Sequence, residues 1–162
     1  MTPPTPRPDF NVVRAVAEAG GAHAQYVVGT ALIDGMYDRT SIAKNPPAGE
    51  AWLQQAVRQG HNPATYMLGA LYKTGADGVP ANPARTLELW QGLLTTPWGQ
   101  QHDIKRHIFT LVAEQLAAPA DSAAAPGAQI TGAALGPNGR ELVITLPNQV
   151  TLKVEWSSAR PG

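Results

Sequence analysis

The feature of this sequence that most constrains its fold is an internal repeat with a period of about 40 residues. The segments 20–35 and 60–75 share five of their sixteen residues, and the members of each pair lie 40 positions apart. The shared residues are Gly20/Gly60, Ala24/Ala64, Tyr26/Tyr66, Gly29/Gly69 and Gly35/Gly75. A period of this length is typical of proteins in which similar structural units stack on one another.

The residues between the two copies repeat as well, with an offset of 37. In this part of the repeat, Asn45, Trp52 and Ala56 correspond to Asn82, Leu89 and Leu93. The three-residue difference lies in the loop 35–45, which is longer than its counterpart, the loop 75–82. Length differences confined to loops are expected where helices stack in an array.

Each copy has the pattern of a helix with its own start and stop signals. Apolar residues recur every four positions, at 24, 28 and 32 and again at 64, 68 and 72, which gives each helix one buried stripe. Asn62-Pro63 and Asn82-Pro83 predict helix starts, with asparagine as the N-cap and proline at the first helical position. Glycines at 20, 35, 60 and 75 predict left-handed helix ends.

Two glycines fall inside these helices, where each costs about 1 kcal/mol relative to alanine. Gly29 and Gly69 occupy the same place in the two copies. Their recurrence favours a packing role, in which the missing side chain lets a neighbouring helix approach closely.

These patterns resemble the Sel1-like repeat, a member of the tetratricopeptide-like helical solenoids. The resemblance covers roughly residues 10–95, and residues 9–20 match the second helix of a preceding unit. It is carried by Ala24–Gly29, Gly35 and Trp52–Gly60 in one unit, and by Ala64–Gly69, Tyr72, Gly75, Gly78-Val79-Pro80 and Asn82 in the next.

The resemblance implies a mainly α fold of about five to six helices, arranged as antiparallel pairs in a solenoid. In tetratricopeptide-like arrays the concave side receives peptides or partner segments. The positions that would line that side here are His23, Tyr26, Thr30, Ile33, Tyr66, Ala70 and Lys73. The alternative for Tyr26 and Tyr66 is that they pack between helices.

The C-terminal third changes in character. Residues 98–118 have one apolar face, which predicts a helix that closes the array. After a Pro/Ala-rich linker, segments 141–146 and 150–156 are rich in β-branched residues, and a third strand around 129–135 would complete an antiparallel meander. Trp156, near its end, is either a partner-binding anchor or a packing residue.

We therefore predict four segments: an extended tail at 1–8, a helical repeat domain at 9–118, a linker at 119–128 and a small β unit at 129–158 packed on the solenoid. A small sheet is marginal alone, so its apolar face must pack on something; the other choice is edge pairing with a second chain.

Several functional classes are disfavoured. Basic and acidic residues number 12 each, so no basic face for nucleic acid is expected. Cysteine is absent, which excludes thiol chemistry and disulfides. The apolar stretches are too short to cross a bilayer. His102 and His107 lie five apart, a poor spacing for a shared metal ion on a helix. We expect no enzyme, no cofactor and no metal.

The sequence predicts a non-catalytic module that binds a protein partner, as a bacterial adaptor or as an immunity protein that blocks a secreted effector or toxin. The alternatives are a periplasmic scaffold associated with the envelope or peptidoglycan, and an accessory domain of an enzyme. The proline-rich start does not read as a secretory signal, which predicts a cytoplasmic location, or a periplasmic one if Met1 has replaced an export signal.

Overall fold

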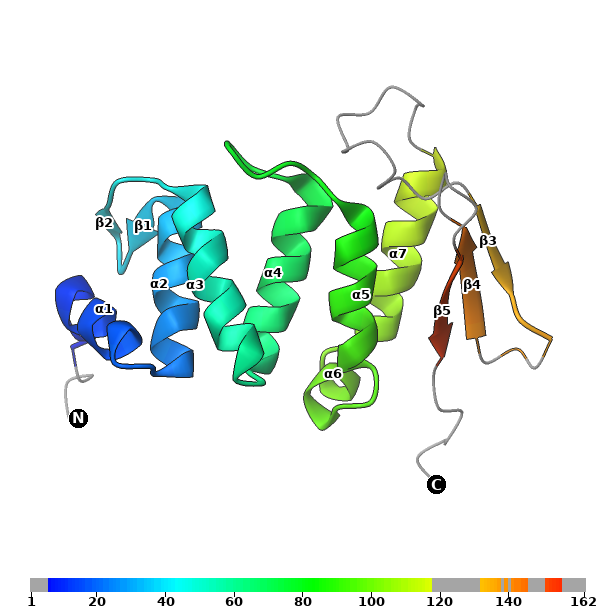
Figure 1. Cartoon of the computed structure of the whole chain (residues 1–162), viewed down its shortest axis with the longest axis horizontal. Coiled ribbons are helices and arrows are strands. Elements are labelled where there is room, and N and C mark those ends of the chain that lie inside the picture. Colours follow the sequence, from blue (N-terminus) through cyan, green and yellow to red (C-terminus); the bar gives the residue numbers. More distant parts are fainter. Residues whose placement is uncertain (1–5, 118–131, 138, 140, 146–150, 156–162) are drawn as a thin grey trace, which may run out of the picture. The chain divides into compact units, whose positions relative to one another are not determined.

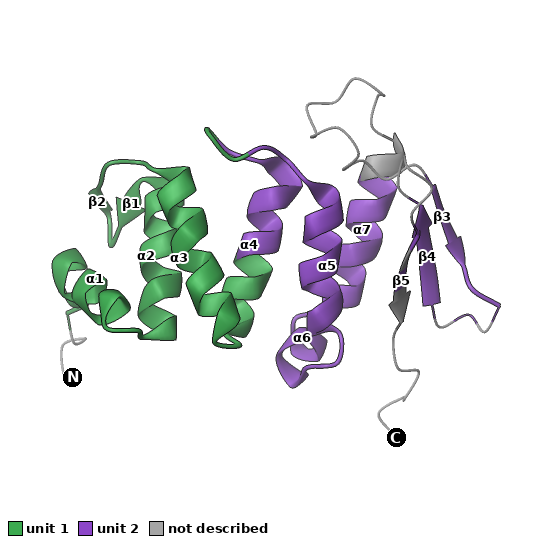
Figure 2. Cartoon of the chain, viewed as in Figure 1, with its two compact units in different colours: residues 1–67, 77–79 green, residues 68–76, 80–162 purple. Residues whose placement is uncertain are grey.

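The computed structural model describes residues 6–117, 132–137, 139, 141–145 and 151–155. These residues form seven helices and five short strands, labelled in Figure 1. The chain divides into two compact units, residues 1–67 with 77–79 and residues 68–76 with 80–162, coloured separately in Figure 2. The mainly helical fold with a small C-terminal antiparallel sheet confirms the predicted fold class.

The first unit is built from helices that lie side by side in chain order. It holds α1 (Phe10–Glu18), α2 (Ala22–Asp34), α3 (Pro46–Arg58) and the start of α4 (Asn62–Thr74). Helix α2 packs against both α1 and α3. The predicted apolar stripe of α2 forms this core, since Ala24 and Val28 are buried and Leu32 packs against them.

The predicted close approach at Gly29 is confirmed. A Cβ atom on Gly29 would lie 2.9 Å from the carbonyl oxygen of Gly49 and 2.9 Å from Cγ of Leu53, both on α3. A Cβ atom on Gly49 would in turn lie 2.6 Å from the carbonyl oxygen of Gly29. The backbones of α2 and α3 therefore touch, which only glycine at both positions permits.

A short hairpin that the sequence analysis missed joins α2 to α3. Strands β1 (Met36–Tyr37) and β2 (Thr40–Ser41) pair antiparallel within the long loop 35–45. Asp38 and Arg39, at its turn, both have positive φ. A turn of this kind normally contains glycine or asparagine, so no familiar signal pointed to it.

The helix starts agree with the prediction in one case and differ in the other. The side chain of Asn82 caps α5 by accepting the backbone N–H of Arg85. The prediction of Asn62 as the N-cap of α4 is wrong, because α4 begins at Asn62 itself and His61 takes the capping position. Gly20, Gly35, Gly60 and Gly75 all have positive φ, as predicted for helix ends.

The second unit contains the rest of α4 with α5 (Pro83–Leu93), α6 (Pro97–Gln101) and α7 (Ile104–Ala117). Trp90 on α5 is 2% exposed and lies against Gly69, where a Cβ atom would clash with its Nε1. Gly69 thus has the predicted packing role, but the neighbour it makes room for is an indole ring and not the backbone of the next helix.

The closing helix predicted over 98–118 is divided in two. Asp103 has a positive φ, which ends the short α6 and starts α7 on a new axis. This division accounts for a seventh helix where five to six were predicted. The predicted apolar face is present on α7, where Ile104, Ile108, Leu111 and Val112 are buried.

The predicted β meander is confirmed. Strands β3 (Gly132–Leu135), β4 (Glu141–Thr145) and β5 (Thr151–Glu155) form an antiparallel sheet in chain order. Leu142 and Ile144 on β4 point to its buried side. The predicted domain boundaries stay a prediction, and the linker 119–128 lies outside the described residues.

Candidate functional site

The candidate site is an apolar groove between α1 and α2 in the first unit. It has a volume of about 930 Å³. Three elements contribute to it: the segment 7–8 with α1, the first half of α2, and Tyr37 of the hairpin. The lining residues are Arg7, Pro8, Val12, Val13, Val16, Gly21, Ala22, His23, Ala24, Tyr26, Val27 and Tyr37.

Valine side chains from α1 supply the exposed apolar surface of the groove. Val12 is 54% exposed and Val16 is 50% exposed, whereas Val13 between them is buried against α2. One turn of helix separates Val12 from Val16, so both point to the same side of α1. Exposure of these valine side chains to water is unfavourable, so an apolar groove of this kind is a candidate binding surface.

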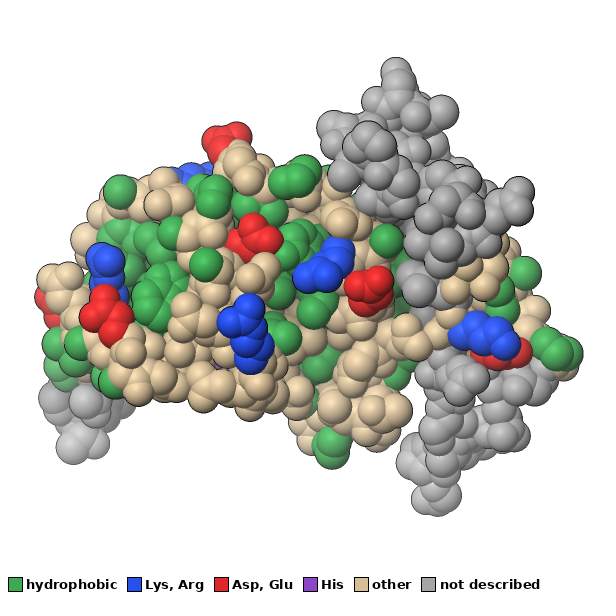
Figure 3. All heavy atoms as spheres, in the orientation of Figure 1, with side chains coloured by type: hydrophobic (Ala, Val, Ile, Leu, Met, Phe, Trp, Pro, Cys, Tyr) green, Lys and Arg blue, Asp and Glu red, His purple; other side chains and the backbone are tan. Residues whose placement is uncertain are grey.

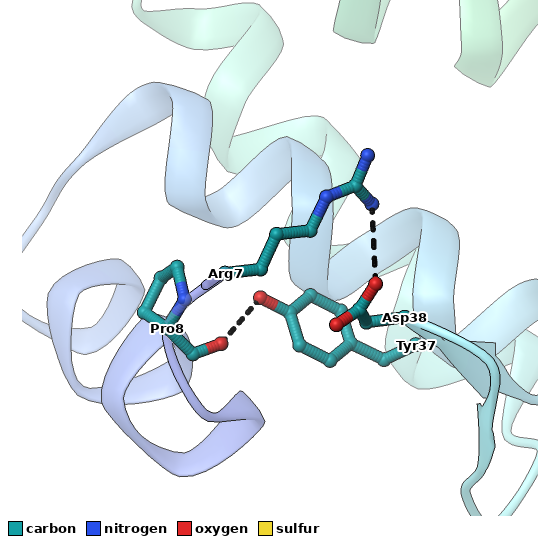
Figure 4. A network of polar contacts seen from close by, with 4 residues as sticks. All are labelled: Arg7, Pro8, Tyr37 and Asp38. Atoms are coloured by element: carbon teal, nitrogen blue, oxygen red, sulfur yellow. Dashed lines mark hydrogen bonds and ion pairs between the residues drawn. The ribbon is translucent and has the colours of Figure 1, made fainter. Parts of the chain in front are cut away.

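One end of the groove is closed by contacts between the hairpin and the residues that precede α1. The hydroxyl of Tyr37 donates to the carbonyl oxygen of Pro8 at 2.7 Å, and the guanidinium of Arg7 lies 4.0 Å from the carboxylate of Asp38 (Figure 4). The ring of Tyr37 also packs on Phe10 of α1, with ring centres 5.4 Å apart. These contacts hold residues 7–8 in place at this end of the groove.

Three rings cluster near the other end. His23 and Tyr26 of α2 meet His61, with ring centres 5.2–5.9 Å apart. Nδ1 of His61 accepts the backbone N–H of Ala64 at 3.2 Å, so the neutral ring carries its proton on Nε2. That proton can be donated to Nδ1 of His23, 3.4 Å away.

The His61 ring is held in its neutral form by these surroundings. Burial, and then the charge of nearby His23, lower the pKa of His61 from its ordinary value of 6.5. Protonation would put a hydrogen on Nδ1 and remove the cap on the first turn of α4. At neutral pH the His61 ring is therefore polar and uncharged.

Charge is sparse over the surface. Figure 3 shows basic and acidic side chains interspersed over the coloured part of one face, without a patch of one sign. Within the described part of the chain, no group of three histidine, aspartate or glutamate side chains could hold a metal ion. None of the helices in the described ranges combines the length and hydropathy that a membrane crossing requires.

The structure brings together two of the predicted site residues, His23 and Tyr26, at the groove. The next two, Thr30 and Ile33, also lie on α2 but do not line the groove. The hydroxyl of Thr30 donates to the carbonyl oxygen of Tyr26, and Ile33 lies against Gly49 of α3.

The remaining predicted site residues lie on α4 or beyond. Tyr66 and Ala70 are half-buried on α4, and Lys73 forms an ion pair with Glu114 of α7 at 3.0 Å. Trp156 lies outside the described residues. Val12, Val16 and Tyr37 were not predicted as groove residues, because nothing in the sequence shows that one side of α1 is left uncovered.

Helices arranged as consecutive packed pairs with repeat-equivalent contacts define the α-solenoid class of helical-repeat proteins. Among solved structures, the chain is similar to a protective antigen of uropathogenic Escherichia coli strains that displays an SLR (Sel1-like repeat) fold. The match has 26% sequence identity and a TM-score of 0.53, and covers 67% of this chain and 21% of that one. No protein-family model and no curated protein sequence matches the chain. The fold of the chain is therefore similar to the Sel1-like repeat fold, and the chain spans about a fifth of that antigen's length.

Proposed function

We propose that this chain is a non-catalytic interaction module that binds a segment of a partner protein in the groove between α1 and α2. The observation that carries the proposal is the pair of half-exposed valines, Val12 and Val16, within a groove of about 930 Å³. Covering apolar surface of this kind with a partner removes it from water, which lowers the free energy and favours binding.

The rim of the groove suits recognition of a protein segment. Tyr26, His23 and Tyr37 present polar atoms beside the apolar floor, and tyrosine is a residue that often supplies much of the binding energy at interfaces. The surface charge is balanced, so affinity would come from desolvation and hydrogen bonds and would depend weakly on salt.

Within this function, we favour a bacterial adaptor or an immunity-type protein that holds a secreted effector or toxin. The Sel1-like repeat fold and its bacterial structural neighbour support a bacterial interaction protein. The apolar groove supports binding of one segment of a partner rather than a small metabolite.

The test begins with affinity isolation of partners and continues with the purified pair. Affinity and thermal melting are measured for the wild type, Tyr26→Ser and Tyr66→Ser. Tyr66 is the matched control because it occupies the equivalent position on α4 but does not line the groove. We expect Tyr26→Ser to weaken binding about tenfold or more.

Equal loss for both variants would move the interface away from the groove. Failure to isolate any partner that binds the purified chain would contradict the proposed function itself.

A further inference from the structure

The uncovered side of α1 corresponds to a side of α3 that the chain itself covers. With an offset of 40, the half-exposed Val12 and Val16 correspond to Trp52 and Ala56, and Val13, which is buried against α2, corresponds to Leu53. The two helices therefore present the same kind of apolar surface at the same place in the repeat. They differ in whether another helix covers that surface.

On α3 that surface is buried. Leu53 and Ala56 are both 0% exposed, and Leu53 packs directly on Gly29 of α2. On α1 the residue equivalent to Ala56 is Val16, which is larger and yet 50% exposed. Helix α2 plays this covering role for α3, and the described residues contain no helix that plays it for α1.

We propose that the groove receives an amphipathic α-helix from the partner protein, which completes the half-repeat that α1 begins; this deepens the proposed function and rests on it. In the repeat, the covering helix precedes the helix it covers, as α2 precedes α3. The partner helix would lie on Val12 and Val16 and run beside α2.

The groove follows α1 and has distinct ends. Its lining runs from Arg7 to Val16 along α1 and covers residues 21–27 of α2, with Tyr37 of the hairpin at the end near Arg7. A helix parallel to α2 would present its free carbonyl groups near Arg7, and a cation there stabilises a helix C-terminus. Continuity with the packing of α2 on α3 favours a helix over an extended peptide.

The chain also supplies a probe for this site. Helices α2 and α4 share the pattern Ala-x-Tyr-x-x-Gly, at 24–29 and 64–69. A synthetic peptide with the sequence of residues 61–75 represents the kind of helix the groove would accept. A peptide with the same residues in scrambled order has the same composition without the apolar stripe.

Because the chain has no cysteine, a single introduced thiol reports on coverage of the groove. Val16→Cys places that thiol in the groove, and Asn11→Cys places one on the exposed side of α1 as the matched control. We expect the 61–75 peptide to slow labelling of Val16→Cys by a maleimide at least fivefold. Labelling of Asn11→Cys should not change, and the scrambled peptide should protect neither thiol.

A second measurement uses the identified partner with the full chain. Val12→Glu should weaken its affinity about tenfold or more, and Asn11→Glu, on the same helix, should leave it unchanged. No protection by the 61–75 peptide at millimolar concentration, or equal protection of both thiols, would overturn the helix proposal.

The remaining outcomes separate this inference from the proposed function. A partner that binds Val12→Glu as tightly as the wild type would refute the helix site while leaving the interaction function intact. Dimerisation of the chain that Val12→Glu abolishes would show that a second copy occupies the groove, which would also overturn the proposal.

Discussion

The two repeat glycines solve the same packing problem in different ways. In the first unit, Gly29 meets Gly49 and Leu53, and the two backbones touch. In the second unit, the residues equivalent to Gly49 and Leu53 at the offset of 37 are Thr86 and Trp90.

In this second arrangement a side chain separates the two helices. The hydroxyl of Thr86 donates to the carbonyl oxygen of Gly69 at 2.8 Å, and Trp90 covers the same glycine. Thr86 is 0% exposed, so its only polar atom is satisfied within the core. The glycine is shared, but the spacing of the helices is set by the residues on the opposite helix, which change together.

The largest expected effect on stability comes from Trp90, whose side chain fills the contact between α4 and α5 at Gly69 (the wider contact). Trp90→Ala should lower the free energy of unfolding by about 3–5 kcal/mol, because it leaves a cavity beside Gly69. Leu53→Ala in the narrower contact should cost about 2–5 kcal/mol, toward the lower end. Chemical denaturation followed by circular dichroism measures both. Equal costs would mean that the two contacts differ less than their side chains suggest.

Overpacking the narrow contact should come next. Gly49→Ala places a Cβ atom 2.6 Å from the carbonyl oxygen of Gly29, so the helices must separate, at about 1–3 kcal/mol. The same denaturation experiment measures the loss. A neutral Gly49→Ala would show that α2 and α3 can move apart freely, against the rigid contact described here.

The hydroxyl bridge of the wider contact should have a smaller effect. Thr86→Val keeps the shape of the side chain and removes its hydrogen bond to Gly69, at about 0.5–1.5 kcal/mol. Thr86→Ser retains the hydroxyl and should restore the hydrogen-bond part of the loss. If both variants cost the same, packing of the methyl group dominates and not the hydrogen bond.

The N-terminal ends of the two equivalent helices α2 and α4 also differ. This difference should make the stability of the chain depend on pH. Helix α2 begins after Gly21 without a side-chain cap, whereas His61 at the equivalent position caps α4. The pKa of His61 is lowered in the folded chain, so the unfolded chain binds the proton more tightly. Stability should be constant above about pH 6.5 and fall as the pH drops below it.

The variant His61→Asn retains a capping group that does not titrate in this range. Melting temperatures from pH 5 to pH 8 should show a shallower acid loss for this variant than for the wild type. Identical profiles would mean that other groups control the acid response.

The smallest effect should have the opposite sign. Gly92 near the end of α5 is exposed, and a Cβ atom there would meet no atom within 4 Å. Gly92→Ala should therefore raise the free energy of unfolding by about 0.5 kcal/mol, less than the roughly 1 kcal/mol of a mid-helix position. Destabilisation would imply a packing role like that of Gly69.

The fold was predictable because its signals are local and recur. The stripe at 24, 28 and 32, the cap at Asn82 and the paired glycines each act within one turn or one helix pair. The β meander was predictable for the same reason, because alternation and turn residues are short-range signals. The break at Asp103 was not, since a non-glycine residue with positive φ leaves no mark in the sequence.

The groove was harder to predict because it depends on what is missing beside α1. Val12 and Val16 look like ordinary core residues of a helix, and only the packed structure shows them half exposed. The His23–His61 contact joins residues 38 positions apart, which periodicity along one helix cannot reveal. Tyr26 does line the groove, because its helix face follows from the neighbouring stripe, and its role in binding a partner stays a prediction.

The loop that makes the repeat irregular has a consequence for how such an array could diversify. This loop, three residues longer than its counterpart, contains the hairpin whose Tyr37 donates a hydrogen bond to Pro8 and forms one end of the groove. The helix contacts at Gly29 and Gly49 do not involve that hairpin. Insertions at this point can therefore reshape the end of the groove while leaving the stacking of the helices, and with it the chain's ability to fold, almost untouched.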